Sequence, residues 1–157
     1  MIDARVSESG SKRLEVLGYE ACIELLSSRA VGRIAWLDRG RIVIVPVNYE
    51  WAHDALWFRT DPGDKLRAFL FSEISLQIDD IDMTSHTGWS VLARGVAKAV
   101  AEHDRVGVGA PAIDTWSPGT KPVLIRMEIT SISGRRLVSN SSASSTGNEF
   151  WRLTASL

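Results

Sequence analysis

A series of β-rich segments separated by short turns is the feature that most restricts how this chain can fold. Apolar and polar side chains alternate on both sides of an Asp38-Arg39-Gly40 turn, and the stretch after the next turn repeats the pattern. Alternation with a period of two, interrupted by turns of a few residues, predicts an antiparallel meander. Similar segments return later in the chain, so the sequence predicts six strands, at 31–37, 41–49, 55–60, 74–81, 89–100 and 123–134.

Two short helices are predicted beside these strands. Residues 19–28 and 64–71 carry apolar side chains at helical spacing, and Cys22 lies on the apolar stripe of the first, where we expect core packing. Mostly antiparallel strands with two outer helices indicate a mainly β protein with a closed or nearly closed barrel, because closure removes exposed edge strands. A β-sandwich satisfies the same pattern.

The length of 157 residues fits a single folded domain. Residues 1–13 are polar and predict a mobile leader, residues 14–138 form the folded domain, and 139–157 predict a Ser-rich, disordered tail. Residues 102–120 contain several Gly and Pro and predict a loop with a helical turn.

Composition argues against several classes of function. Lys and Arg number 18 and Asp and Glu 19, so the near-zero net charge gives the whole protein no attraction for nucleic acid or an anionic membrane. The single cysteine and the three histidines lack metal-ligand spacing. Every apolar run is far shorter than the about 20 residues that span a bilayer. We therefore expect a cytoplasmic protein that binds no metal, nucleic acid or membrane.

The junction between the third strand and the second helix carries the clearest chemical signal. Arg59 and Thr60 end the strand, a Pro-Gly turn follows, and Lys65 lies in the first helical turn, where acidic residues are usually preferred. Two positive side chains, a hydroxyl and free backbone N–H groups would hold a dianionic phosphate if the turn is tight. Alternatively, both basic residues are solvated and pair with Asp61 and Asp64.

Several short motifs recur in an order known from one family. They are Val31-Gly32-Arg33-Ile34-Ala35, Val45-Pro46-Val47-Asn48-Tyr49, Phe58-Arg59-Thr60, Gly63-Asp64-Lys65-Leu66, Asp79-Asp80-Ile81-Asp82, Gly88-Trp89-Ser90-Val91, and Ile129-Thr130 before Gly134-Arg135-Arg136. Together they resemble the pyridoxamine 5′-phosphate oxidase-like family of FMN-binding split barrels, especially its short actinobacterial-type members. The resemblance covers residues 14–137 and implies a six-stranded antiparallel split barrel.

The resemblance also implies where the cofactor lies. Thr60 and Lys65 would hold the flavin phosphate with Arg59 beside them, and the strand around Val45–Asn48 would run along the isoalloxazine ring. Trp89 and Ser90 would reach FMN from a second subunit, so the resemblance implies a homodimer with sites at the subunit interface. Trp116 is a further tryptophan that we place near a ring-shaped ligand. The predicted cofactor residues are Val45, Pro46, Val47, Asn48, Arg59, Thr60, Lys65, Leu66, Trp89, Ser90 and Trp116.

The predicted function is a flavin-dependent oxidoreductase with FMN as cofactor and an unassigned small-molecule substrate. One alternative is a reductase that uses the deazaflavin F420, and another is a non-catalytic protein that binds or stores flavin. The oxidases of the family end in an Arg- and His-containing segment that binds pyridoxal phosphate, whereas this chain ends in 150–157 without that motif. We therefore do not expect pyridoxamine phosphate as the substrate. The sequence points to no protein general acid or base, and whether Arg135 or Arg136 faces the site stays open.

Overall fold

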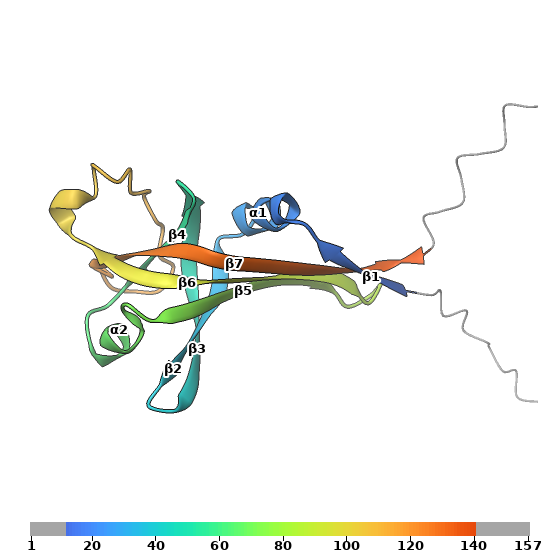
Figure 1. The fold of residues 1–157 in the computed structure, drawn as a ribbon, viewed down its shortest axis with the longest axis horizontal. Helices are drawn as coiled ribbons and strands as arrows, with labels where there is room; N and C mark the ends of the chain where they lie inside the picture. The colour runs from blue at the N-terminus through green and yellow to red at the C-terminus, as the bar shows by residue number, and fades with distance from the viewer. Residues whose placement is uncertain (1–11, 141–157) are drawn as a thin grey trace, which may run out of the picture.

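The computed structural model describes residues 12–140, which form a strand-rich barrel with two short helices (Figure 1). The elements are β1 (Lys12–Leu17), α1 (Tyr19–Ser27), β2 (Val31–Asp38), β3 (Arg41–Ala52), β4 (Ala55–Thr60), α2 (Asp64–Phe69), β5 (Glu73–Asp82), β6 (Thr87–Val100), the 3-10 helix η1 (Glu102–Asp104) and β7 (Val123–Ser139).

Six strands close into a ring. The order is β7-β4-β3-β2-β5-β6, and β6 pairs again with β7, with every neighbouring pair antiparallel. β7 is long enough to pair with β4 through Val123–Glu128 and with β6 along most of its length. The ring confirms the predicted mainly β, six-stranded antiparallel barrel and rules out the β-sandwich alternative.

The first strand was not predicted. β1 pairs antiparallel with the last part of β7, from Lys12 opposite Ser139 to Leu17 opposite Gly134. Lys12 and Arg13, assigned to the leader, therefore belong to a strand, and Ser139 closes β7. This strand forms through its pairing with β7 and not through a local signal. β1 is mostly exposed and has no alternating buried face that the sequence could reveal. The rest of the predicted leader and tail, 1–11 and 141–157, lies outside the described residues.

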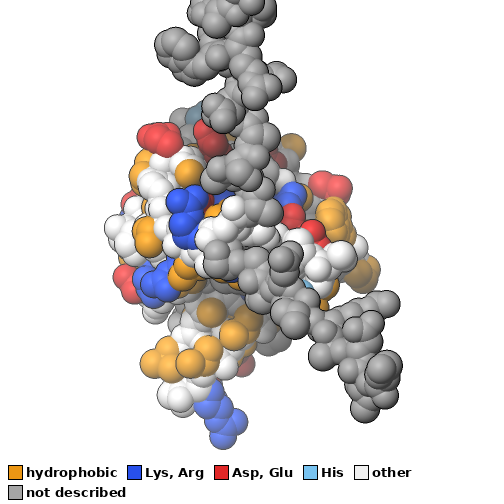
Figure 2. Space-filling model, turned by 90° about the vertical axis from the view of Figure 1, so that its right-hand side faces the viewer, with side chains coloured by type: hydrophobic (Ala, Val, Ile, Leu, Met, Phe, Trp, Pro, Cys, Tyr) orange, Lys and Arg blue, Asp and Glu red, His pale blue; other side chains and the backbone are white. Residues whose placement is uncertain are grey.

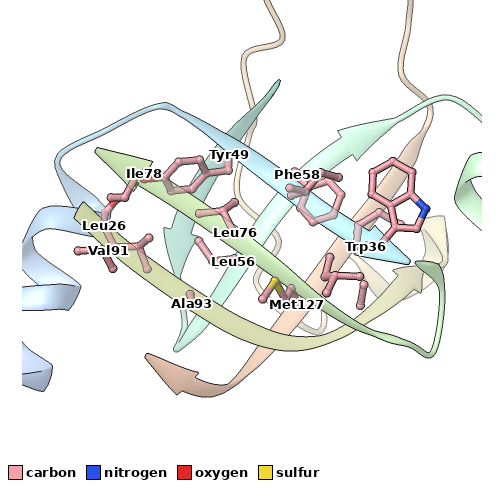
Figure 3. Packing of buried hydrophobic residues seen from close by; sticks show 14 of the residues in the cluster. Leu26, Trp36, Tyr49, Leu56, Phe58, Leu76, Ile78, Val91, Ala93 and Met127 are labelled. Carbon is pink, nitrogen blue, oxygen red and sulfur yellow. Dashed lines mark hydrogen bonds between the residues drawn. The ribbon is translucent and has the colours of Figure 1, made fainter. Parts of the chain in front are cut away.

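The barrel interior is a continuous apolar core. Figure 3 shows side chains from α1 and from β2 to β7 converging between the strands, with Tyr49, Leu56 and Leu76 near the middle. α1 contributes Cys22 and Leu26 to this core, which confirms the predicted packing of Cys22. The Tyr49 hydroxyl donates to the Leu26 carbonyl at 2.6 Å, and burial raises the pKa of Tyr49, so this donor stays protonated.

Strand pairing brings two distant segments together at one end of the barrel. Thr60, the last residue of β4, pairs with Val123, the first residue of β7. The loop that leads into β7 therefore runs beside the end of β4 and the start of α2. Within the described part of the chain, neither helix is long and apolar enough to cross a membrane.

Candidate functional site

A cavity of about 460 Å³ opens where β3, the end of β4, the start of α2 and the loop before β7 meet. The volume lies within the range of about 300–1,000 Å³ typical of small-molecule sites. Its wall combines apolar side chains from β2 and β3 with polar groups from the end of β4. The cavity brings together the predicted residues Val45, Pro46, Val47, Asn48, Arg59, Thr60 and Trp116.

One edge of β3 is open toward this cavity. β2 pairs with β3 from Arg41 to Asn48, but β4 pairs only with Tyr49–Ala52. In the described residues, the first part of β3 thus has a strand neighbour on one side only. Pro46, which cannot donate to a ladder, is tolerated in such a half-paired strand. The geometry leaves backbone polar groups of Val45–Val47 without a strand partner on the cavity side.

The polar end of the cavity is built around Arg59. Its Nη1 donates to the Lys121 carbonyl at 3.2 Å, and the Lys121 ammonium forms an ion pair with Asp61. Asp64 pairs with Arg67 at 2.5 Å. Neither acidic neighbour forms an ion pair with the Arg59 guanidinium, so the surface-charge alternative does not hold for Arg59, whereas the Lys65 side chain lies outside the described atoms. Among the described residues, the Thr60 hydroxyl makes only a long 3.4 Å contact with the Asp61 carbonyl.

The apolar end contains a buried donor without an acceptor. Trp36 lines the cavity, is 5% exposed and meets Phe69 edge-on, with 5.3 Å between the ring centroids. Its indole Nε1 is buried and has no hydrogen-bond partner among the described residues. A buried unpaired donor costs about 1–3 kcal/mol. The Trp36 ring itself forms part of the apolar wall at this end of the cavity.

The second part of the phosphate motif is less complete. Lys65 lies in the first turn of the six-residue helix α2, but its side chain is outside the described atoms. Leu66 is half-buried and packs against the hydrophobic core, and it is not among the residues that line the cavity. Gly63 precedes α2 with a φ of 148° and provides no side-chain cap for the free N–H groups.

Trp89 and Ser90 lie elsewhere on the same chain. They line a second hollow of about 520 Å³, together with residues of β1, β5, β7 and the β5–β6 turn, and the two cavities share no lining residue. Arg29 lies over the Trp89 ring at 5.3 Å from its centroid and pairs with Asp80. In Figure 1 this end of β6 is near β1, whereas α2 is at the opposite end. One chain therefore does not bring Trp89 and Ser90 to the first cavity.

Sequence reasoning missed several cavity residues, among them Trp36 and Lys121. Trp36 lies at an inward position of its alternating strand, so the two-residue period predicts that it is buried. The same pattern does not show that its N–H is unpaired. Lys121 reaches the site through the pairing of Thr60 with Val123, which the local sequence does not contain. The described residues hold no group of His, Cys, Asp and Glu that could bind a metal ion.

The fold and the cavity define a closed antiparallel barrel with a ligand-sized pocket beside a half-paired strand. Residues 19–136 match the family model described as pyridoxamine 5′-phosphate oxidase, and the chain belongs to this family.

One curated protein and two solved structures are similar to this chain. An uncharacterized protein of Mycobacterium tuberculosis is 25% identical over 146 residues, which cover 84% of this chain and 96% of the relative. The solved FAD-binding protein of Mycobacterium smegmatis is 30% identical with a TM-score of 0.61, covering 79% of this chain and 98% of that chain. An FAD-binding protein of Mesorhizobium loti shares the fold, with 22% identity and a TM-score of 0.65. The match covers 82% of this chain and 100% of that chain.

Proposed function

We propose that the cavity beside β3 binds a flavin nucleotide and that the protein works as a flavin-dependent oxidoreductase. The observation that carries the proposal is a ligand-sized cavity in which an open strand edge and apolar side chains lie beside the Arg59 guanidinium and the Thr60 hydroxyl. A flavin offers matching groups: a planar ring, acceptor atoms on its edge and a phosphate. The names of the two FAD-binding relatives support a flavin as the ligand class.

Each part of the cavity has a role in this proposal. The half-paired stretch Val45–Asn48 binds the polar edge of the ring through backbone groups, and Trp36 forms part of the apolar wall beside the ring. Arg59 and Thr60 hold the phosphate, with Lys65 as the third contact that the sequence implies. A bound flavin would supply the hydride or electron transfer, while the chain binds, orients and shields it.

FMN is our proposed form of the flavin. The groups that we assign to a phosphate lie together, at Arg59, Thr60 and the start of α2. The relatives named as FAD-binding make FAD the first alternative, and F420 is a further one. A non-catalytic flavin-binding protein would have the same site and differ only in lacking turnover. Pyridoxamine phosphate is not our proposed substrate, and the segment on which that exclusion rests, 150–157, lies outside the described residues.

The proposal includes a homodimer with one site at each end of the interface. Trp89 and Ser90 line a different hollow from the cofactor cavity, so only a second copy would bring them to the ring. The outward face of the β2–β3 hairpin offers a surface for that copy. Leu37 and Ile42 are register partners there, and Ile44 follows on the same face; they are 66%, 75% and 61% exposed. Figure 2 shows apolar side chains over the projecting lobe in which this hairpin lies.

Purified protein is expected to be yellow and to release FMN on denaturation. The visible absorption spectrum and the mass of the released compound identify the ligand. Reduction by NAD(P)H with turnover then separates an oxidoreductase from a storage protein. Release of FAD would show that the cavity binds a flavin but that FMN is the wrong form. A colourless protein that takes up F420 and no flavin would contradict the proposal.

The variant Ile42→Asp is expected to shift the protein from dimer to monomer and to weaken flavin binding by about tenfold, because a charge buried in an apolar interface is costly. Sedimentation velocity measures the first effect and fluorescence titration the second. Val106→Asp is the matched control, since Val106 is 92% exposed and lies on the loop after η1. A dimeric Ile42→Asp protein with full affinity would show that this hairpin is not the interface.

A further inference from the structure

The loop before β7 forms one wall of the cofactor cavity. Residues 111–122 have no regular secondary structure, yet Thr115, Trp116, Ser117 and Lys121 line the cavity. A segment with few backbone hydrogen bonds is held in place only where side chains fix it. The points at which this loop is attached therefore decide the shape of that wall.

One attachment lies on β3. The Trp116 backbone N–H donates to Oδ1 of Asn48 at 2.9 Å. Within the described residues, this is the one hydrogen bond that joins residues 111–120 to the rest of the protein. Asn48 is half-buried and ends the open stretch of β3, so it joins the strand along which the ring is proposed to bind to the loop opposite it.

The second attachment lies at the phosphate end. The Lys121 carbonyl accepts from Arg59, and the Lys121 ammonium pairs with Asp61. Lys121 has a φ of 40°, a left-handed conformation that is uncommon for a residue with a side chain and that marks a sharp change of direction. The loop is thus tied to both ends of the proposed ligand site.

Trp116 is the largest side chain on this loop and is 70% exposed, although it lines the cavity. No ring contact of Trp116 with another described residue occurs in the structure. An exposed aromatic face at the mouth of a ligand cavity provides a surface on which a planar ring can stack. Its position follows from its backbone, which Asn48 holds.

We infer that Asn48 is a positioning residue, whose side-chain oxygen fixes Trp116 as a stacking wall and so determines which planar ligands the cavity accepts. This inference rests on the proposed flavin site. It differs from the backbone contact that we propose for Val45–Asn48, because the side chain of Asn48 acts on the ligand through the loop. The residue that touches the ligand from this side is Trp116.

Amide hydrogen exchange in the free protein tests the attachment directly. In Asn48→Ala the Trp116 amide loses its acceptor, and we expect its exchange to become roughly 3- to 10-fold faster. Asn48→Asp keeps an acceptor oxygen and should exchange at nearly the wild-type rate. Asp114→Asn is the control on the same loop, since its exposed carboxylate forms no hydrogen bond or ion pair with another described residue. Thermal unfolding verifies that each variant is folded.

A double-mutant cycle on FMN affinity tests the route of the effect. Asn48→Ala and Trp116→Ala should each weaken binding by roughly 3- to 10-fold, and the double variant should bind about as well as Trp116→Ala alone. Additive losses of affinity would mean that the Asn48 side chain contacts the ligand itself, which overturns the positioning role. Unchanged Trp116 exchange in Asn48→Ala overturns it too, even with FMN binding intact. If the Trp116 amide exchanges faster in Asn48→Ala but the wild-type protein binds no flavin, the positioning role holds and the proposed function is overturned.

Discussion

Replacing Gly95 by alanine is expected to destabilise the barrel by about 3 kcal/mol, in the upper range of effects caused by overpacking. Gly95 lies at a register irregularity between β6 and β7, where Arg94 pairs with Ser131 but Gly95 pairs with Ile129. A Cβ atom at this position would overlap the Glu128 carbonyl oxygen and would lie 3.1 Å from Cα of Ile129. Backbone atoms cannot turn aside like a flexible side chain, so the two longest strands must separate locally.

Urea unfolding followed by tryptophan fluorescence measures this effect, because Trp36 and Trp57 lie in the core and Trp116 lies on the surface. Gly107→Ala is the matched control, since the nearest atom to its new Cβ would be the Asp104 carbonyl oxygen at an ordinary 3.6 Å. We expect the control to stay within about 0.5 kcal/mol of wild type. A Gly95→Ala protein as stable as the control would show that β6 and β7 are not in close contact there.

The sequence predicts the ring of six strands well, because each of those strands carries its own local signal. β2 alternates buried and exposed positions through Gly32, Ile34 and Trp36, and a short turn at Asp38-Arg39-Gly40 leads into β3. β1 has no such signal, because it lies on the end of β7 with most of its side chains exposed. Its existence depends on a partner more than 100 residues away, which no local pattern contains.

The candidate site was predictable where neighbouring residues in the sequence build it. Arg59 and Thr60 lie next to each other at the end of β4 and both line the cavity. Lys121 could not be found in this way, since it depends on the pairing of β4 with β7. Nor does the sequence show that Asn48 accepts a hydrogen bond from Trp116, because that contact joins residues 68 positions apart.

Arg59→Ala is expected to weaken FMN binding by about tenfold or more while changing riboflavin binding little. The guanidinium lines the cavity and is not neutralised by Asp61 or Asp64, so it remains available for a charge-assisted contact with a phosphate. Riboflavin has the same ring without the phosphate, so a loss caused only by movement of the Lys121 loop would affect both ligands alike. Because the family resemblance places Lys65 at the same phosphate, we expect Lys65→Ala to weaken FMN binding by about tenfold or more as well.

Arg67→Ala is the matched control for this loss of charge. Arg67 belongs to α2, pairs with Asp64 at 2.5 Å and is exposed outside the cavity. We expect its removal to leave FMN and riboflavin affinities within about twofold of wild type, as for other exposed ion pairs. If Arg67→Ala lost as much FMN affinity as Arg59→Ala, the effect would come from general surface charge and not from one phosphate contact.

The dissociation constants of FMN and riboflavin, measured by fluorescence titration on wild type and on Arg59→Ala, test the phosphate seat most directly. We expect wild type to prefer FMN by about a hundredfold, as for two or more charge-assisted contacts, and Arg59→Ala to lose at least tenfold of that preference. Equal affinities of wild type for the two ligands, or an undiminished preference in Arg59→Ala, would contradict a phosphate held at the end of β4.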